Sequence, residues 1–222
     1  MSKIKIAIQG ELGAYSHIAV EKIYKDAEIK TCSTFEDTFK QAYNDPKYKI
    51  IIPIENSLAG RVADIHYLLP KYKLQIHGEY FLQVEHNLLG KPEATIDDIK
   101  YVRSHAQAIS QCQKIISKNN FKTIISVDTA GSAKDLAQGE DKTIAAIASD
   151  LSAKMYNLKI LQKNIEDDKG NVTRFLIMGK NIEQPDYDKN KKYITSCIFR
   201  VKSEPSALYK CLGGFATNQV NL

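Results

Sequence analysis

The chain has 222 residues, a formal net charge of +5 and four cysteines, a length that suits one large domain or two small ones. Apolar residues make up 43% of it and charged residues 26%, as is ordinary for a globular protein. The longest apolar runs, such as residues 49–54, are too short to span a bilayer. The lysines are spread along the chain rather than gathered in a patch, which argues against a nucleic-acid binder.

The cysteines and histidines indicate no metal centre. Cys32, Cys112, Cys197 and Cys211 lie far apart in the sequence, with no pair at metal-ligand or redox spacing. The five histidines are equally scattered, and no glycine-rich nucleotide loop of the usual spacing is present. We therefore expect neither a metal nor a cofactor. The N-terminus enters a strand pattern at once, without a secretory or transit segment, which predicts a cytoplasmic protein.

Strand and helix signals alternate along the first third of the chain. Residues 3–8 alternate like a half-buried strand, and Ser16 is a good N-cap for a helix to about Lys25. Ser33-Thr34-Phe35-Glu36 predicts the capping box of a second helix, which ends near Pro46. The next expected elements are a buried strand at 49–53, a loop at 55–60, a short helix at about 62–69 and an extended crossing segment at 74–84.

The middle of the chain repeats a strand followed by a helix. The strands are expected at 101–103, 122–127 and 143–147, with helices that begin at Ser104, near Thr129 or Ser132, and at about Ser149. This alternation predicts βαβ units and a largely parallel sheet. The chain then returns through 158–169 to a buried strand at 173–178. We interpret the pattern as two α/β lobes with a cleft between them, the first formed by about 1–78 and 164–180 and the second by about 79–163.

The last forty residues have a different character. Residues 181–192 form a polar linker, and residues 194–201 predict a strand. Pro205 opens a helix whose apolar face carries Leu208, Leu212 and Phe215 at i, i+4 and i+7.

Four motifs carry the candidate chemistry. They are Pro53-Ile54-Glu55-Asn56-Ser57-Leu58-Ala59-Gly60, Ser104-His105-Ala106-Gln107-Ala108, Asp128-Thr129-Ala130-Gly131 and Gly170-Asn171-Val172-Thr173-Arg174-Phe175. Three of the four arginines adjoin motif loops, in a chain that otherwise uses lysine for positive charge. Helix N-termini, side-chain amides and guanidinium groups are donors suited to carboxylates. Plain helix capping explains any one of the serines equally well, but not their association with amides and an arginine.

In this order and spacing, the four motifs resemble those of the prephenate dehydratase family, and the resemblance covers residues 3–222. It implies an α/β catalytic domain at 1–180 with two lobes like those of type II periplasmic binding proteins. A linker at 181–192 and a partial ferredoxin-like ACT fragment (βαβ) at 193–222 would follow. Ser206-Ala207-Leu208-Tyr209 stands where the family has Gly-Ala-Leu-Tyr, and the chain stops in what would be the second ACT strand. We therefore expect an incomplete ACT domain and no normal feedback inhibition by phenylalanine.

The resemblance also implies an activity, which is the loss of carbon dioxide and the ring hydroxyl from prephenate to give phenylpyruvate in phenylalanine biosynthesis. It points to Thr173 as the catalytic hydroxyl. The substrate contacts that we expect are Asn56, Ser57, Ser104, Gln107, Thr129, Ala130, Gly131, Asn171, Arg174 and Phe175. Neighbouring strand residues face opposite ways, so one of Thr173 and Arg174 is expected to be structural. The expected partners are prephenate and further copies of the chain in a dimer or tetramer, with no nucleic acid and no membrane.

Alternatives remain open at this level. The chain could act on arogenate, the aminated form of the substrate, or bind a small carboxylate between two lobes without catalysis. Glu55 is interpreted as a carboxylate that orders its loop, with a proton relay as the other reading. His86 is interpreted as structural rather than as an acid, and His105 is expected to point away from the cleft.

Overall fold

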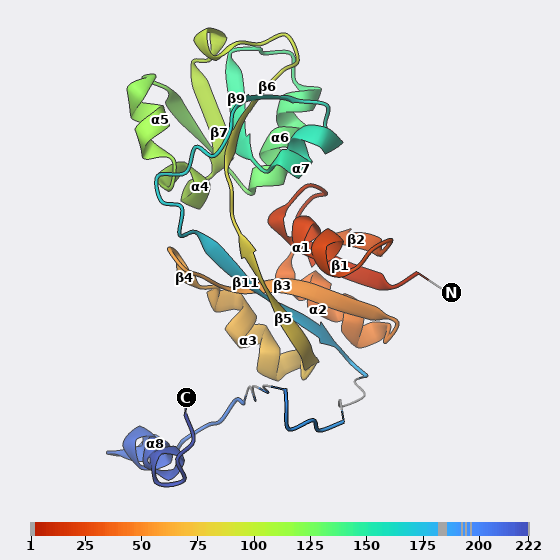
Figure 1. The fold of residues 1–222 in the computed structure, drawn as a ribbon, viewed down its shortest axis with the longest axis vertical. Coiled ribbons are helices and arrows are strands. Elements are labelled where there is room, and N and C mark those ends of the chain that lie inside the picture. Colours follow the sequence, from red (N-terminus) through yellow and green to blue (C-terminus); the bar gives the residue numbers. More distant parts are fainter. Residues whose placement is uncertain (1–2, 182–185, 192, 194, 196, 222) are drawn as a thin grey trace. The chain divides into compact units, whose positions relative to one another are not determined.

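The computed structural model describes residues 3–181, 186–191, 193, 195 and 197–221. The chain divides into two compact units, Met1–Gln184 and Pro185–Leu222. The first unit holds two lobes, each built on its own β-sheet (Figure 1). No helix in these ranges is long and apolar enough to cross a membrane.

The sheet of the first lobe has the strand order β2-β1-β3-β11-β5, and β4 pairs with β3 outside this path. Strands β1, β2 and β3 are parallel, whereas β11 runs antiparallel to both β3 and β5. The strands are β1 (Lys5–Gln9), β2 (Glu28–Cys32), β3 (Tyr48–Asn56), β4 (Gly60–Arg61), β5 (Gln75–Gln83) and β11 (Val172–Gly179).

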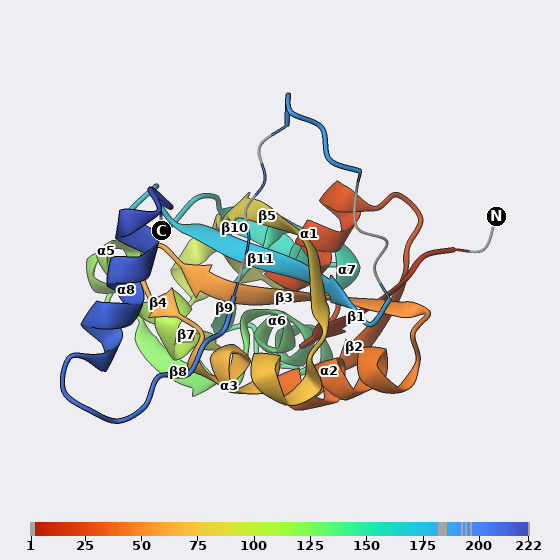
Figure 2. The ribbon, with the colours of Figure 1, turned by 90° about the horizontal axis from the view of Figure 1, so that it is seen from below.

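Three helices cover the two faces of this sheet. Figure 2 shows α1 (Tyr15–Ile23) on one face and α2 (Phe35–Asn44) with α3 (Ala63–Tyr72) on the other. Successive residues of the central strand β3 serve the two faces in turn, because strand side chains alternate. Ile51 packs in the cluster that contains α1, and Ile50 and Ile52 pack in the cluster that contains α2 and α3. Strand β3 is therefore apolar on both sides.

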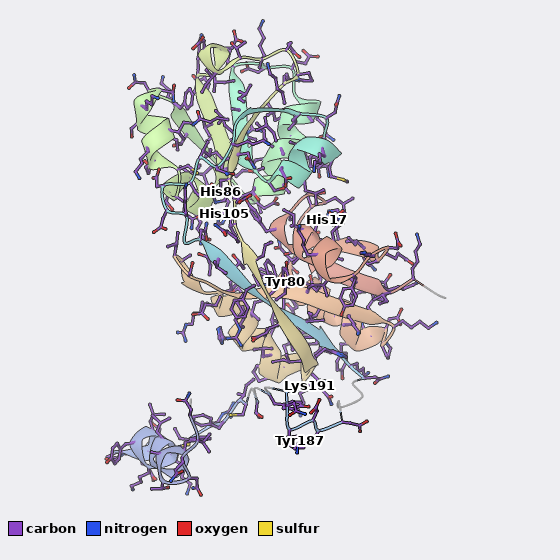
Figure 3. All side chains as sticks on the ribbon, in the orientation of Figure 1. His17, Tyr80, His86, His105, Tyr187 and Lys191 are labelled. Atoms are coloured by element: carbon purple, nitrogen blue, oxygen red, sulfur yellow. The ribbon has the colours of Figure 1, made fainter. Side chains whose placement is uncertain are left out.

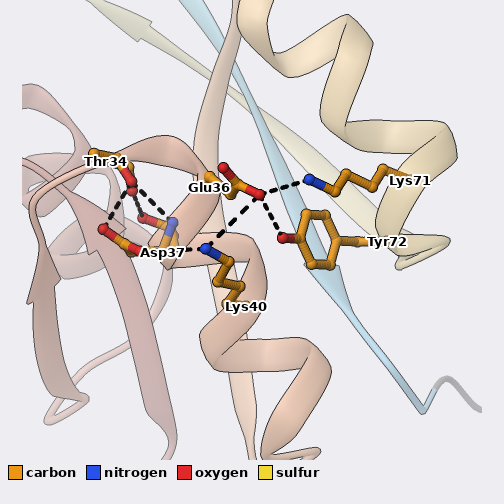
Figure 4. A network of polar contacts seen from close by, with 7 residues as sticks. Thr34, Glu36, Asp37, Lys40, Lys71 and Tyr72 are labelled. Carbon is orange, nitrogen blue, oxygen red and sulfur yellow. Dashed lines mark hydrogen bonds and ion pairs between the residues drawn. The ribbon is translucent and has the colours of Figure 1, made fainter.

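A surface network ties α3 to α2 (Figure 4). The Glu36 carboxylate accepts hydrogen bonds from Lys71 Nζ at 2.6 Å and from the Tyr72 hydroxyl at 2.9 Å. These two donors lower the pKa of Glu36. Lys40 lies 3.7 Å from the same carboxylate. The charged side chains of the network are exposed, and the network lies outside the cavity described below, so its role is structural.

The second lobe has the strand order β10-β6-β9-β7-β8. Strand β7 is parallel to β8 and β9, whereas β6 is antiparallel to β9 and β10. One face packs against α4 and α5 and the other against α6 and α7. The elements are β6 (Asn87–Gly90), a 3₁₀ turn (Ile96–Asp98), β7 (Tyr101–His105), α4 (Ala106–Ser110), α5 (Gln113–Lys118), β8 (Lys122–Ser126), α6 (Thr129–Gln138), β9 (Ile144–Ala148), α7 (Asp150–Met155) and β10 (Lys159–Gln162).

The structure corrects two expectations about this architecture. The sheets are mixed rather than largely parallel, because β11 runs antiparallel to its neighbours in the first sheet and β6 does so in the second. The first crossing lies at residues 84–86 rather than near 79, since β5 stays in the first sheet as far as Gln83. The two crossing segments support each other through hydrogen bonds from Val84 N to Asn171 O and from Ile165 N to His86 O, both 2.8 Å.

Several predicted helix caps are also wrong. Ser16 lies inside α1, whose N-cap Ala14 provides no side-chain bond. The cap of α2 is Thr34, which accepts from Asp37 N at 3.0 Å, so the expected box is shifted by one residue. Ser104, expected to begin a helix, is the penultimate residue of β7. At Thr34 and Ser104 the preceding loop or strand extends further than the local sequence indicated, whereas at Ser16 the helix begins earlier.

The second unit contains the helix α8 (Ala207–Thr217), which begins close to Pro205 as expected. Its apolar side chains Leu208 and Leu212 are exposed. The strand expected at 194–201 is not formed by residues 195 and 197–201, and residues 194 and 196 lie outside the described part. A strand needs a hydrogen-bonding neighbour, and residues 197–201 pair with none.

A loop of the first lobe holds the second lobe directly. Gly13 O accepts the hydroxyls of Ser149 at 2.6 Å and Ser152 at 3.0 Å, both at the start of α7. The Tyr156 hydroxyl donates to Leu12 O at 2.8 Å. The loop therefore fixes the entry to α1 against the second lobe.

Both the backbone conformation of Gly13 and its close approach to Ser152 require a glycine, so we expect Gly13→Ala to lower the stability of the fold. Its φ is +91°, and an added Cβ would lie 2.6 Å from Ser152 Oγ and 2.9 Å from Ser152 Cα. The matched control is Gly60→Ala, because Gly60 has φ +80° and nothing within 4 Å of an added Cβ. We expect the control to lose about 1–2 kcal/mol from the left-handed backbone alone and Gly13→Ala to lose more. Urea unfolding of both variants measures this, and equal losses would mean that the approach to Ser152 is unimportant.

Candidate active site at the junction of the lobes

A cavity of about 390 Å³ lies where the two lobes meet. Residues from both lobes and from both crossing segments line it. The polar and charged lining residues are Gln9, Tyr15, Ser16, Asn56, His86, His105, Gln107, Gln111, Asp128, Thr129, Asn171 and Thr173, and the apolar ones include Phe35, Pro53, Val62, Val84, Ala108, Val127 and Phe175. A polar wall and an apolar wall therefore share one space, as in a typical small-molecule site.

The polar wall begins at Asn56, whose orientation the backbone determines. Asn56 Oδ1 accepts the backbone N–H groups of Leu58 at 3.1 Å and Ala59 at 3.0 Å. Its Nδ2 must then face the other way, and it donates to Asn171 Oδ1 at 2.7 Å and to Thr173 Oγ1 at 2.9 Å. Thr173 and Asn56 are direct cross-strand neighbours on β11 and β3. Both hydrogens of the Asn56 amide are thus used.

The amide orientation of Asn171 in turn determines which nitrogen of His86 carries the hydrogen. Asn171 Oδ1 is occupied by Asn56, so its Nδ2 donates to Gln111 Oε1, at 2.9 Å. The same Gln111 oxygen lies 2.9 Å from His86 Nε2, and an oxygen can only accept. The hydrogen of neutral His86 is therefore on Nε2. Its Nδ1 is left to face the Tyr15 hydroxyl at 2.7 Å, and Figure 3 labels His86 at this junction. We call the chain Asn56–Asn171–Gln111–His86 the amide ladder.

The ladder leaves Thr173 as a hydrogen-bond donor to the cavity. Its Oγ1 accepts from Asn56, so its own hydrogen remains available. No acceptor for that hydrogen occurs among the described residues around it, although Thr173 is only 8% exposed. A buried hydroxyl hydrogen without a protein acceptor is suited to a substrate oxygen.

The cavity contains little fixed charge. None of the lining residues is lysine or arginine, and Asp128 is the acidic one among them. Burial lowers the pKa of His86, while the hydrogen bond to Gln111 and the charge of Glu166 act in the opposite direction. Burial also raises the pKa of Tyr15 well above its usual value. His86 is therefore neutral and Tyr15 is protonated near pH 7.

The cavity brings together six of the eleven residues expected from the sequence. Thr173 and Asn56, Gln107, Thr129, Asn171 and Phe175 line it, and five residues do not. Ser57 bonds to the return crossing through Gly170 O at 2.7 Å, and the buried Ser104 hydroxyl donates to Ile147 O at 2.7 Å. The other three outside the lining are Ala130, Gly131 and Arg174.

Arg174 illustrates why two adjacent motif residues have different surroundings. Its Nε and Nη2 lie 2.7 and 2.6 Å from Glu79 Oε2 on β5, and its guanidinium lies 5.9 Å from the Phe81 ring centre. Thr173 faces the cavity from the same strand, so Arg174 points to the other side. The structure therefore gives no support to a substrate clamp at Arg174.

Other site residues were missed or misplaced by the sequence analysis. His105 lines the cavity, and its Nδ1 accepts from Gln107 N at 3.3 Å as the N-cap of α4, so the expectation that it points away is wrong. Tyr15 and Gln111 were not singled out at all. Gln111 lies one helical turn after Gln107, and this i, i+4 spacing was the signal that could have found it. Within the described ranges, no group of three or more His, Cys, Asp or Glu residues could hold a metal ion.

The buried His86 predicts a loss of stability in acid. Its pKa is lower in the folded chain than the 6.5 of a free histidine, so the unfolded chain binds the proton more readily. The resulting stability is complete above pH 6.5 and is lost as the pH falls through the folded pKa. His17 and His77 are also shifted downward by burial and contribute in the same sense. We expect His86→Gln to flatten the decline of unfolding free energy between about pH 7 and pH 5, measured by urea unfolding. Equal slopes in both proteins would assign the effect to other groups.

Comparison with known proteins agrees with this architecture. A family model described as prephenate dehydratase matches residues 6–183. Arogenate dehydratase/prephenate dehydratase 2 of Arabidopsis thaliana is 38% identical over 221 residues, which cover all of this chain and 58% of that protein. Prephenate dehydratase of Methanocaldococcus jannaschii is 39% identical over 95% of this chain and 77% of that protein. The solved structure of the Staphylococcus aureus prephenate dehydratase is 27% identical, with a TM-score of 0.76, over 98% of this chain and 81% of that one.

The extent of these matches decides the family. The chain spans little more than half the length of the Arabidopsis relative, but the family model covers most of its first unit. The family resemblance and the two-lobed α/β fold that the four motifs predicted are confirmed. The chain belongs to the prephenate dehydratase family.

Proposed function

We propose that this chain converts prephenate to phenylpyruvate, carbon dioxide and water. The observation that carries the proposal is the free hydroxyl hydrogen of Thr173, whose oxygen accepts from Asn56, at the wall of a cavity that no lysine or arginine lines. In the reaction, the bond between the ring and its carboxylate breaks, and its electron pair enters the ring. The bond from the ring to the hydroxyl breaks as well, and the leaving oxygen takes up one proton to become water. The ring becomes aromatic, with no net oxidation or reduction.

Thr173 is proposed to act on the leaving oxygen. A hydrogen bond from Thr173 to the ring hydroxyl strengthens as negative charge develops on that oxygen, and it stabilises the transition state more than the ground state. Asn56 supports this by donating to Thr173 Oγ1, which polarises the hydroxyl. The apolar wall formed by Phe175, Val84 and Pro53 is suited to the departing carboxylate, because a poorly solvated carboxylate loses carbon dioxide more readily.

The domain arrangement is part of the proposal. We propose a catalytic domain at 1–180, a linker at 181–192 and the beginning of an ACT domain at 193–222. The match of the family model to residues 6–183 and the compact unit Met1–Gln184 support the first boundary. The exposed apolar residues of α8 support an element that packs elsewhere, in keeping with the expected homo-oligomer.

Arogenate is the second candidate substrate, and Asp128 is the observation that favours it. Asp128 is the acidic residue of the cavity lining and could pair with the ammonium group that arogenate has and prephenate lacks. Asp128→Asn preserves the cap on α6, since Asn caps helices as well as Asp does. If arogenate is the substrate, this change lowers kcat/KM for arogenate and not for prephenate. An unchanged ratio would remove the argument for arogenate.

The decisive measurement of activity uses the purified full chain with prephenate and with arogenate side by side. We expect phenylpyruvate to form from prephenate, and the same rate after treatment with a chelator. Folded protein that turns over neither substrate would contradict the proposal. A chelated protein that regains activity only with a divalent ion would contradict a cofactor-free reaction.

Thr173 and Arg174 make a matched pair for mutation. We expect Thr173→Val to lower kcat by about 10²–10⁴-fold, the range for losing a positioned proton donor, and Thr173→Ser to retain most of it. Arg174→Gln removes the contact with Glu79 but leaves the cavity lining intact, so we expect kcat within a few-fold of the original and a lower melting temperature. If Arg174→Gln instead loses as much activity as Thr173→Val at unchanged stability, Arg174 acts on the substrate after all.

A further inference from the structure

The cavity lacks a cation, although the proposed substrate carries two carboxylates. None of the lining residues is lysine or arginine, and Arg174 is paired with Glu79. Backbone N–H groups at a helix N-terminus are the usual alternative for holding a carboxylate. Three helices begin at the cavity, namely α1, α4 and α6, and they differ in whether their first turn is already occupied.

Two of the three helix ends are unsuitable. At α6, Asp128 places its own carboxylate on Gly131 N at 2.5 Å, so a negative charge already occupies that end. The α4 helix has five residues, too few for a useful dipole. His105 also caps its first turn.

The N-terminus of α1 is open. Its N-cap Ala14 makes no side-chain bond, and its first turn contains no acidic residue. The first N–H to find a helical carbonyl is that of Ile18, which donates to Ala14 O at 3.1 Å. The N–H groups of Tyr15, Ser16 and His17 therefore precede any intrahelical acceptor.

Ser16 supplies an independent indication of a ligand at this end. Its side chain lines the cavity and is 8% exposed. Its hydroxyl bonds to no other residue in the described part of the chain, and it is not one of the fully buried atoms without a partner, so it is accessible to a ligand in the cavity. Gln9, which ends β1 just before this loop, also lines the cavity. A hydroxyl and free N–H groups thus meet at one point without a protein acceptor.

We propose that the N-terminus of α1, with the Ser16 hydroxyl, holds the carboxylate that the substrate keeps in the product. This inference rests on the proposed function. The retained carboxylate is the better occupant because the departing one would be stabilised by such donors, which would oppose its loss. The loop from Gly13 is fixed to Ser149 and Ser152, so the donors are held in place before the substrate arrives.

Two small probe molecules test this carboxylate site at the N-terminus of α1 without any turnover of substrate. 3-Phenylpropanoate has the ring and the retained carboxylate of the product, and 3-phenylpropanamide is its uncharged counterpart. Calorimetric titration of the full chain should show tighter binding of the acid, by about 10-fold or more, as for hydrogen bonds to a charged group. Equal binding of the two probes, or binding of neither, would overturn the proposal.

Two isosteric variants separate charge from size. Ser16→Asp places a carboxylate at the N-terminus of α1. We expect this change to weaken binding of 3-phenylpropanoate by at least about 100-fold through like-charge repulsion. Ser16→Asn has the same shape without the charge, and it should retain the preference for the acid. The melting temperature of Ser16→Asp should be equal to or above that of Ser16→Asn, because an acid at a helix N-terminus is stabilising. An acid preference that is the same in both variants would overturn the proposal.

Kinetic measurements with prephenate distinguish an error in the proposed carboxylate site from an error in the proposed function. Since the retained carboxylate is held equally in the ground and transition states, Ser16→Ala should raise KM by about 10-fold with little change in kcat. If the unmodified chain turns over prephenate but binds 3-phenylpropanoate no more tightly than 3-phenylpropanamide, the proposed function holds and the carboxylate site at α1 is contradicted. If the chain prefers 3-phenylpropanoate but turns over neither prephenate nor arogenate, the carboxylate site is supported and the proposed function is contradicted.

Discussion

The orientation of one asparagine amide controls the polar wall of the cavity. Asn56 Oδ1 is held by two backbone N–H groups, and every later partner in the amide ladder must then present a defined atom. Reversing any amide in the ladder would place two donors or two acceptors against each other, at a cost of about 1–3 kcal/mol for each buried group left unpaired. The hydrogen on His86 Nε2 and the free hydrogen on Thr173 both follow from this single constraint.

The ladder also connects parts of the chain that are far apart in sequence. Asn56 belongs to the first lobe, Gln111 to the second, and Asn171 and His86 to the two crossings. The bonds that orient the site therefore also hold the lobes at this separation. The loop around Gly13 adds a second connection through α7. The bonds that position Thr173 thus also hold together the two lobes that form the cavity, which suits a reaction that requires an accurately placed donor.

The absence of a cation from the lining is consistent with this chemistry. An arginine beside the departing carboxylate would stabilise the charge that has to disappear. Neutral donors such as amides, hydroxyls and backbone N–H groups can orient a substrate with a smaller effect of this kind. Of the charged groups in the motifs, Arg174 pairs with Glu79 outside the lining, and Asp128 lines the cavity while it caps the first turn of α6.

The sequence by itself determined the family, the two-lobed α/β fold and the order of most elements. Those properties depend on local periodicity and on motifs that are contiguous in the chain. It also brought Thr173, Asn56 and Asn171 to attention, since they belong to such motifs. Only the tertiary structure decided which side of a strand faces the cavity, as between Thr173 and Arg174, and which serine has no partner, as between Ser16 and Ser104. Those distinctions depend on contacts between residues as far apart as Asn56 and Thr173 or Ser104 and Ile147. Local pattern carries no information about such long-range pairing, because any polar side chain can bond to whichever group the fold places beside it.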